Sequence, residues 1–356
     1  FMMVTNRLAI VTGMPTIHAI RKYYGPVASG VVGCAMFLSC LFFTMGNISG
    51  TGAGMNLIFG IDWKIGSLIM IAVVVYMYFA KNVYSKVEKI ITLCIVLMIV
   101  AFYATLVGVG GPDPQGLAKG LFGFKIPEGS LSTALAFIST NAAVTAGIYG
   151  TYLGKEKKWK KDDLFNGVML TDAITHIVSV SLISGAIVLV GAVVLHPQGL
   201  SIKAPAQLAE MLVPIMGGSA RYIMGLALLG AGFSSLLANT QRGMVLLGAG
   251  LNKDVSLESK FIRIGCLACL AFAMVVCYSY GGSPTQLILM ANIATSIATP
   301  FGGLFMVLMI WRDDLSEGYK KPTGLRICMT ISYIFAVIMT ISGLSTQIPK
   351  ILALFH

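Results

Sequence analysis

The chain has 356 residues, of which 56% are hydrophobic and 11% are charged, and its formal net charge is +11. A soluble domain carries about 25% charged residues, so the composition excludes an ordinary soluble domain and indicates an all-α integral membrane protein embedded in a lipid bilayer. The positive charge does not indicate nucleic-acid binding, because the sequence has no basic stripe with interleaved aromatic residues. It fits the excess of Lys and Arg that short cytoplasmic loops of membrane proteins carry.

Apolar segments of about 20 residues are long enough to span a bilayer as helices. Residues 1–12 are expected to be the end of one such span, because the chain starts at Phe1 inside an apolar run. Full spans are predicted near 26–59, 64–81, 85–110, 130–153, 163–196, 218–251, 259–281, 284–311 and 323–346. The amphipathic segment 204–216 is expected to lie at the outer surface. Residues 1–356 are therefore expected to form a single transmembrane domain.

Polar residues inside a span are candidates for function, and one group lies at 139–147. It includes Thr140, Asn141, Ala143 and Thr145 and is rich in small residues that form helices poorly. Such a stretch predicts an unwound helix whose backbone carbonyls can meet a cation in mid-membrane. The alternative is a packing face of small residues whose hydroxyls bond to their own helix.

Two more polar stripes lie inside predicted spans. Thr44, Asn47 and Thr51 share one helical face, within a stretch that also carries glycines at 46, 50, 52 and 54. They indicate either a wet pathway or a packing seam. The other stripe comprises Asn292, Thr295, Ser296 and Thr299, and it precedes Pro300. Proline frees a backbone carbonyl about one turn earlier, so this stripe indicates either a site or a kink with ordinary packing.

Charged residues deep inside spans are costly unless they are paired. Asp172 and Arg242 lie at similar depths, and we expect them to form an ion pair. The pair would either staple the structure or act as a proton or gating element. His176, one turn beyond Asp172, either joins this network or is a satisfied core residue. The sequence contains no nucleophile elbow, P-loop or His-Glu-x-x-His pattern, so an enzyme is not expected.

Several segments occur in an order and spacing typical of one family. They are RLAIVTG at 7–13 followed by Arg21, NLIFG at 56–60, the region 205–218, AGFSS at 231–235 followed by Gln241, and 283–301. Together they resemble the NRAMP family of divalent-metal transporters over essentially the whole chain. The resemblance implies a LeuT-like fold of two inverted five-helix repeats. The family's first helix, with its Asp-Pro-Gly-Asn motif, has no match here and is expected to be missing from this sequence.

The resemblance also implies a metal site. In the family the metal binds between helix one and helix six, where helix six supplies a carbonyl and the Met of a Met-Pro-His motif. The Met and His positions correspond here to Ala143 and Thr145. The carbonyl would come from Thr140, with Asn141 beside it. Asn292 stands where the family has a metal-facing Gln in helix ten.

The same comparison implies changes along the proton route. Thr44 and Asn47 stand where helix three of the family has an Asp and a Glu, whereas Asp172 falls where helix seven carries an aspartate. Gln241 and Arg242 are candidate pathway or gating residues on helix eight. Loss of acidic and His groups removes the titratable groups that proton coupling needs.

The loss of a thioether changes the expected ion. Sulfur ligands favour soft transition metals, whereas an oxygen-lined, wider site suits Mg²⁺, which keeps several of its waters. The pattern resembles the NRAMP-related magnesium transporters. We therefore expect alternating-access transport of Mg²⁺, with Mn²⁺ as a second substrate, without proton coupling and without a cofactor, by a monomer in a prokaryotic plasma membrane. The alternatives are a proton-coupled Mn²⁺/Fe²⁺ transporter, an amino-acid transporter of the same fold and a non-transporting sensor.

Overall fold

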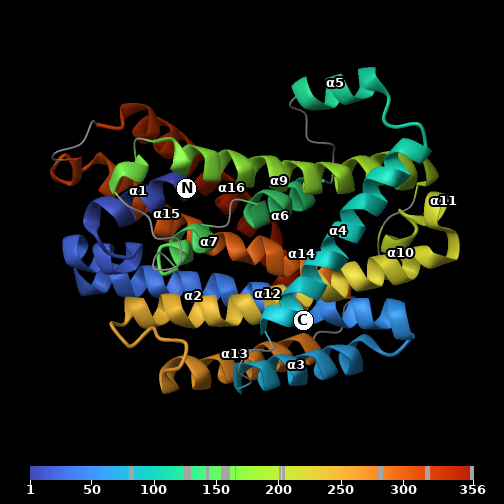
Figure 1. Cartoon of the computed structure of the whole chain (residues 1–356), viewed down its shortest axis with the longest axis horizontal. Coiled ribbons are helices and arrows are strands. Elements are labelled where there is room, and N and C mark those ends of the chain that lie inside the picture. The colour runs from blue at the N-terminus through green and yellow to red at the C-terminus, as the bar shows by residue number, and fades with distance from the viewer. Residues whose placement is uncertain are drawn as a thin grey trace.

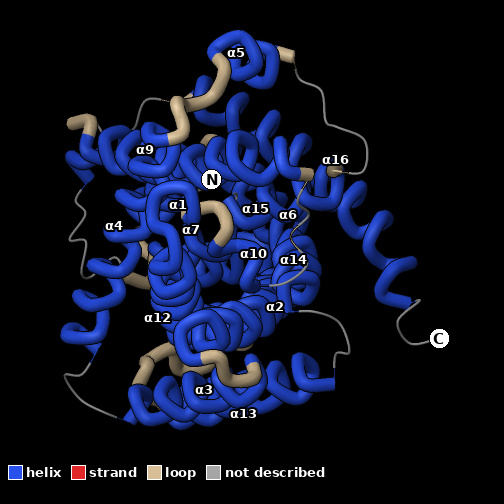
Figure 2. Tube along the Cα trace, turned by 90° about the vertical axis from the view of Figure 1, so that its right-hand side faces the viewer, coloured by secondary structure: helices blue, strands red, loops and turns tan. Residues whose placement is uncertain are grey.

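The computed structural model describes residues 1–79, 84–123, 130–141, 144–153, 161–164, 166–199, 202, 205–279, 284–316 and 321–352. Within these ranges all regular structure is helical (Figure 2). The α-helices are α1 (Met2–Thr12), α2 (Thr16–Phe59), α3 (Trp63–Phe79), α4 (Tyr84–Gly108), α5 (Pro114–Phe122), α6 (Leu131–Asn141), α7 (Val144–Gly150), α9 (Val168–Val190), α10 (Pro205–Ala209), α11 (Val213–Met216), α12 (Ala220–Gly250), α13 (Lys260–Ser279), α14 (Pro284–Ala294), α15 (Ala298–Trp311) and α16 (Thr323–Leu352).

Short turns of other helix types join some of these elements. A π-helix (Gly191–Leu195) and a 3₁₀-helix (His196–Gln198) extend α9, and a 3₁₀-helix (Thr295–Ile297) joins α14 to α15. Two more 3₁₀-helices are Gly217–Ser219 before α12 and Asp314–Ser316 after α15, and another is Lys161–Leu164.

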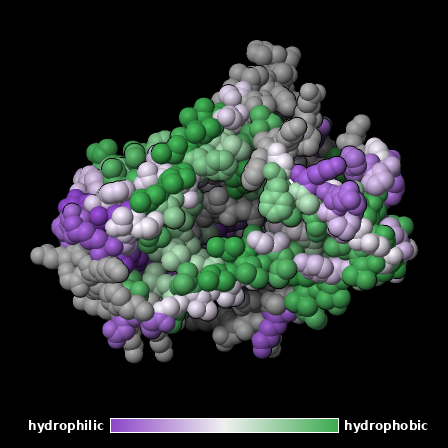
Figure 3. Space-filling view, turned by 90° about the horizontal axis from the view of Figure 1, so that it is seen from above, coloured by the Kyte–Doolittle hydropathy of each residue, from purple (hydrophilic) through white to green (hydrophobic). Residues whose placement is uncertain are grey.

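The predicted spans overlap the observed helices, but some ends differ: α2 begins at Thr16 rather than at 26, α9 begins at Val168 rather than at 163, and α16 ends at Leu352 rather than at 346. Six helices in the described part of the chain are long and apolar enough to cross a membrane. In Figure 3, hydrophobic residues cover most of the described middle of the face shown, and hydrophilic residues gather toward its two ends. This distribution fits a protein surrounded by lipid at its waist.

The predicted span at 26–59 begins at a kink in helix α2. α2 runs on from Thr16, but Gly25 has φ of 91° and ψ of 174°, outside the helical range. Glycine tolerates positive φ, and the Pro26 that follows cannot donate a hydrogen bond to the preceding turn. The segment 16–24 therefore meets the long apolar part of α2 at a kink.

The centre of the molecule is the contact between α2 and α12, which lie side by side (Figure 1). A Cβ atom added to Gly33 would lie 2.8 Å from the Gly250 Cα atom, and one added to Gly54 would lie 2.6 Å from the Leu229 nitrogen. The two backbones therefore touch near both ends of the part of α2 that follows residue 25, and the helices are antiparallel. Small residues permit this approach. Gly54 thus belongs to a packing seam, whereas Gly46, Asn47 and Gly50 of the same stretch line a cavity.

The remaining helices pack on two sides of this central pair. α3 and α13 lie together along one side, with α3 against α2 and α13 against both α2 and α12 (Figure 1). On the other side, buried residues of α1, α7, α15 and α16 form one apolar cluster with α2 and α12. α4, α9 and the segment from α10 to α12 enclose another. The α2–α12 pair is thus the centre against which the other helices pack.

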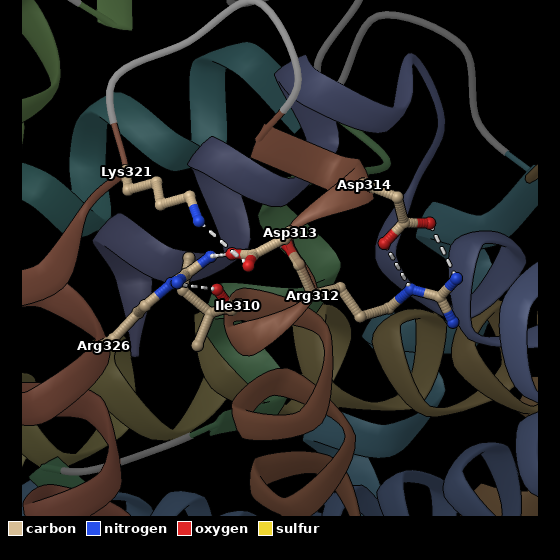
Figure 4. A network of polar contacts seen from close by, with 6 residues as sticks. All are labelled: Ile310, Arg312, Asp313, Asp314, Lys321 and Arg326. Atoms are coloured by element: carbon tan, nitrogen blue, oxygen red, sulfur yellow. Dashed lines mark hydrogen bonds and ion pairs between the residues drawn. The ribbon is translucent and has the colours of Figure 1, made fainter.

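A network of charges closes the connection between α15 and α16 (Figure 4). Arg326 is 6% exposed; its Nε donates to the Ile310 carbonyl at 2.8 Å, and its Nη2 donates to Asp313 Oδ1 at 3.0 Å. Lys321 also donates to Asp313, and the two cations hold the pKa of that carboxyl below its usual range. Arg312 pairs with Asp314 at 2.7 Å.

Candidate metal-transport site

Four of the predicted site residues line one cavity of about 610 Å³. They come from four helices: Asn47 from α2, Thr140 from α6, Arg242 from α12 and Asn292 from α14. These helices are far apart in sequence and meet because α2 packs against both α12 and α14, and α14 packs against α6. Four side chains that the sequence singled out for different reasons therefore converge in space.

The polar atoms on the cavity wall are mostly neutral. Thr140 is exposed to the cavity, and its hydroxyl donates to the Ala136 carbonyl of its own helix at 2.9 Å. Asn47 is half-buried, and its Nδ2 has no hydrogen-bond partner among the described groups. No described lining residue is an Asp or a Glu. The wall thus offers amide and hydroxyl oxygens, which are ligands that hard cations accept.

The described residues contain no cluster of three or more His, Cys, Asp or Glu side chains able to hold a metal ion. The described residues therefore offer a cation neutral oxygens only. Ala143 lies outside the described residues, and Asn141 is described only as the last residue of α6. The implied roles of both residues stay predictions.

The polar stripe before Pro300 is partly used for structure. The Thr295 hydroxyl donates to the Asn292 carbonyl at 2.6 Å, and the Ser296 hydroxyl donates to the Ile293 carbonyl at 2.8 Å. The Thr295 carbonyl, at the 3₁₀ break, accepts a hydrogen bond of 2.7 Å from the Ser39 hydroxyl of α2. These contacts hold the break in place beside Asn292, which remains on the cavity wall.

Several predicted pathway residues lie elsewhere. Thr44 is fully buried, and its hydroxyl donates to the Cys40 carbonyl at 2.9 Å, so it packs within α2 and does not line the cavity. Thr145 on α7 is 1% exposed. Gln241 lines a separate cavity of about 290 Å³ together with Glu258 and Arg263.

The expected ion pair between Asp172 and Arg242 is not what the structure shows for Arg242. Its guanidinium carbon lies 5.6 Å from the centroid of the Tyr149 ring, and its Nε is buried without a hydrogen-bond partner. Asp172 lies on α9 next to Ala173, which lines a third cavity, of about 520 Å³, together with His176. The two charges thus belong to different regions, because α9 packs against α1 and α4, while Arg242 faces the central cavity.

Sequence reasoning did not single out several residues of the cavity wall, among them Ser235 and Asn239. Ser235 and Asn239 precede Arg242 on α12 and also line the cavity. Their spacing of i, i+4 and i+7 puts them on one helical face. The same helical spacing that singled out Thr44 and Asn47 is present on this face of α12.

The profile of the family described as natural resistance-associated macrophage protein-like, Nramp, matches residues 1–346. The chain belongs to the Nramp family of divalent metal transporters. It is therefore a multi-pass membrane transporter and not an enzyme. The resemblance that the sequence motifs indicated is confirmed at the level of the family.

Curated Nramp relatives align with most of this chain. The divalent metal cation transporter MntH of Listeria monocytogenes serotype 4a (strain HCC23) is 23% identical over 354 residues, covering 94% of this chain and 77% of the relative. MntH of Agrobacterium fabrum (strain C58 / ATCC 33970) is 24% identical over 356 residues, covering 94% and 74%. Both descriptions name divalent metal cations in general.

The fold is also that of solved Nramp structures. A crystal structure of a mutant manganese transporter from Eremococcus coleocola superposes with a TM-score of 0.73 at 15% sequence identity, covering 99% of this chain and 78% of that protein. The predicted all-α, LeuT-like architecture is therefore confirmed.

Proposed function

We propose that this Nramp chain carries Mg²⁺ across the membrane by alternating access through the 610 Å³ cavity, without coupled proton movement. The observation that supports the proposal is the chemistry of the described wall: Asn47, Thr140 and Asn292 are neutral oxygen-bearing residues, and no described lining residue is acidic. Mg²⁺ dehydrates reluctantly, and the oxygens of amides and hydroxyls suit an ion that keeps its waters.

The absence of acidic residues from the described cavity wall also bears on whether metal transport is coupled to protons. A proton that moves with the metal needs a titratable group within the path. Asn47 is an amide, and Thr44, where the resemblance implies an acid, is a buried hydroxyl bonded to its own helix. Neither side chain titrates near neutral pH. The proposed transport is therefore driven only by the concentration gradient of the metal ion and by the membrane potential.

A second candidate is proton-coupled transport of Mn²⁺ or Fe²⁺. It is favoured by the relatives, since one similar structure is that of a manganese transporter and others are named as divalent metal cation transporters. The amino-acid transporter and sensor alternatives receive no comparable support. The relatives favour manganese, whereas the side chains of this chain favour magnesium, so the two are separated by measurement of selectivity.

Restoring a sulfur ligand tests the proposed selectivity. Ala143→Met places a thioether where the resemblance implies the family's Met, and thioethers favour transition metals over Mg²⁺. Purified protein in proteoliposomes is expected to show Mg²⁺ uptake that Mn²⁺ and Cd²⁺ inhibit weakly. In the variant the inhibition by Cd²⁺ is expected to strengthen by at least about tenfold, equivalent to roughly 1.4 kcal/mol. An unchanged order of cations in this variant would remove the proposed basis of selectivity.

Removing a polar group from the cavity wall tests the route. Asn47→Ala is expected to lower the uptake of Mg²⁺ several-fold, because its amide lines the cavity. Thr105→Val is the matched control, since Thr105 is fully buried on α4 and its hydroxyl donates only to the Ala101 carbonyl. Equal uptake by Asn47→Ala and the wild type would place the route elsewhere.

A further inference from the structure

A cavity of about 290 Å³ lies between α3, α12 and α13, apart from the central one. Its wall includes Tyr78 and Phe79 from α3, Gln241 from α12 and Arg263 from α13. α3 and α13 lie on one side of the α2–α12 pair, and the N-terminus lies on the other side (Figure 1, Figure 2). The wall is therefore built from residues within the chain that lie away from its first residue. We refer to this space as the α13 cavity.

The α13 cavity has one charge of each sign on its described wall, Glu258 and Arg263. Glu258 is exposed in the turn before α13, whereas Arg263 is half-buried in the first turn of the helix. No described ion pair joins the two, and the Arg263 Nε is buried without a hydrogen-bond partner among the described groups. The segment 80–83, AKNV, which follows Phe79, contains no acidic residue either. Both charges are therefore available to a ligand.

The polar groups of the α13 cavity suit a ligand that is itself zwitterionic. A guanidinium binds phosphate oxygens through parallel N–H donors, and the half-buried amide of Gln241 lies on the same wall. The Tyr78 hydroxyl is already hydrogen-bonded to the Thr240 hydroxyl of α12. The Glu258 carboxylate accepts hydrogen bonds and can take them from a primary ammonium. A phosphate joined to an ammonium by a short arm therefore matches both charges.

The rim of the α13 cavity is apolar and faces the lipid. Phe79 and Leu257 both line the cavity and are exposed. Lys253 and Lys260 lie in or beside the connection from α12 to α13, and such basic residues mark the cytoplasmic side of a membrane. The volume is near the lower end of the range for ligand sites, about 300–1,000 Å³. The space therefore suits a lipid headgroup at the inner membrane surface, with its chains outside the cavity.

We propose that the α13 cavity binds the headgroup of an inner-leaflet phospholipid of the phosphatidylethanolamine class. Arg263 and Gln241 hold the phosphate, Glu258 accepts hydrogen bonds from the ammonium, and the acyl chains lie against Phe79 and Leu257. An anionic phospholipid without an ammonium would place uncompensated negative charge beside Glu258, and a choline headgroup has no N–H to donate. The site thus distinguishes ethanolamine lipids from both other classes, whichever cation the protein transports.

Lipid binding is tested with the whole protein, washed free of lipid in detergent. The protein is titrated with short-chain lipids of identical chains that carry ethanolamine, choline or glycerol headgroups, and with free phosphoethanolamine. The melting temperature is expected to rise and to saturate at a several-fold lower concentration of the ethanolamine lipid than of the other two. Equal effects of the three lipids mean non-specific coating of the protein and overturn the proposal. An equal effect of free phosphoethanolamine would overturn the assignment to a lipid.

Variants assign the preference to the α13 cavity. Glu258→Lys makes both charges on the described wall positive and is expected to reverse the preference in favour of the anionic glycerol lipid. Asp254→Lys is the matched control, because it makes the same change of charge in the same connection, at an exposed residue that does not line the cavity. Arg263→Gln is expected to abolish the preference. If Arg263→Gln does not fold, the exposed Glu258 still decides, and an unchanged preference in Glu258→Lys would overturn the proposal.

A direct count of bound lipid separates this inference from the proposed function. Native mass spectrometry of the wild type and of Asp254→Lys, each released from micelles with equal amounts of the three lipids, is expected to show one ethanolamine lipid retained in several-fold excess. A retained lipid without any Mg²⁺ uptake in proteoliposomes would contradict the proposed function and leave the lipid site standing. Mg²⁺ uptake by a protein that retains the three lipids equally would do the reverse.

Discussion

The contact between α2 and α12 makes a sharp prediction at Gly33. A Cβ atom at this position would lie 2.8 Å from the Gly250 Cα atom and 2.9 Å from the Leu246 carbonyl oxygen. Both are backbone atoms, so they cannot rotate away. Non-bonded carbon atoms settle at about 3.5 Å, and Gly33→Ala therefore forces the two helices apart by roughly 0.7 Å at this point. Overpacking of this kind costs about 1–3 kcal/mol.

Gly30 provides the matched control one turn earlier on the same helix. A Cβ atom there would lie 4.0 Å from the Gly250 carbonyl oxygen, which is an ordinary contact. Gly→Ala also raises helix propensity by about 1 kcal/mol, but both variants share this gain. The difference between Gly33→Ala and Gly30→Ala thus isolates the steric contact.

The assay is reversible unfolding in mixed micelles, followed by tryptophan fluorescence. Gly33→Ala is expected to be less stable than Gly30→Ala by about 1–3 kcal/mol. Equal stability of the two variants would show that α2 and α12 are further apart than described. The walls of the central cavity would then also be further apart.

Two further predictions concern His18, in the segment 16–24 that precedes the kink of α2, and Arg326, near the start of α16. Burial and the nearby Arg21 lower the pKa of His18, whose Nδ1 lies 3.0 Å from the Tyr152 hydroxyl. The folded state therefore disfavours the proton, so stability is complete above the ordinary pKa of about 6.5 and falls as the pH drops below it; thermal unfolding should show this slope in the wild type and lose it in His18→Gln. Arg326→Leu should destabilise the protein more than Lys321→Leu, because buried Arg326 serves both Asp313 and the Ile310 carbonyl. Detergent unfolding checks this order, and equal effects would contradict it.

The helices could be predicted because their signal is carried by composition alone. Runs of apolar residues bounded by charged loops marked α3, α12 and α13 to within a few residues. The predicted start of one span at residue 26 coincides with the kink at Gly25, although the kink itself was not predicted. The amphipathic segment at 204–216 contains the short helices α10 and α11, whose boundaries periodicity does not resolve.

The cavity could be predicted only in part. Asn47 and Asn292 were found because intramembrane amides are rare and lie on polar helical faces, and both line the cavity. Thr44 shared the face of Asn47 in sequence, yet its hydroxyl is satisfied within α2. Helical spacing places side chains on a face, but it does not determine which neighbouring helix covers that face.

The two charged residues inside spans, Asp172 and Arg242, show the same limit of prediction from sequence. Asp172 and Arg242 were expected to pair because each is costly in lipid and both lie at a similar depth. Depth is readable from sequence, whereas the lateral arrangement of α9 and α12 is not. Arg242 instead stacks on Tyr149 of α7 and faces the cavity.

The central claim is that a dication crosses the membrane without an accompanying proton. Protein in liposomes that contain a pH-sensitive dye and a Mg²⁺ indicator is exposed to an inward Mg²⁺ gradient at a fixed membrane potential. The internal concentration of Mg²⁺ is expected to rise with no change of internal pH. Mn²⁺ entry accompanied by acidification, with Mg²⁺ excluded, would contradict it.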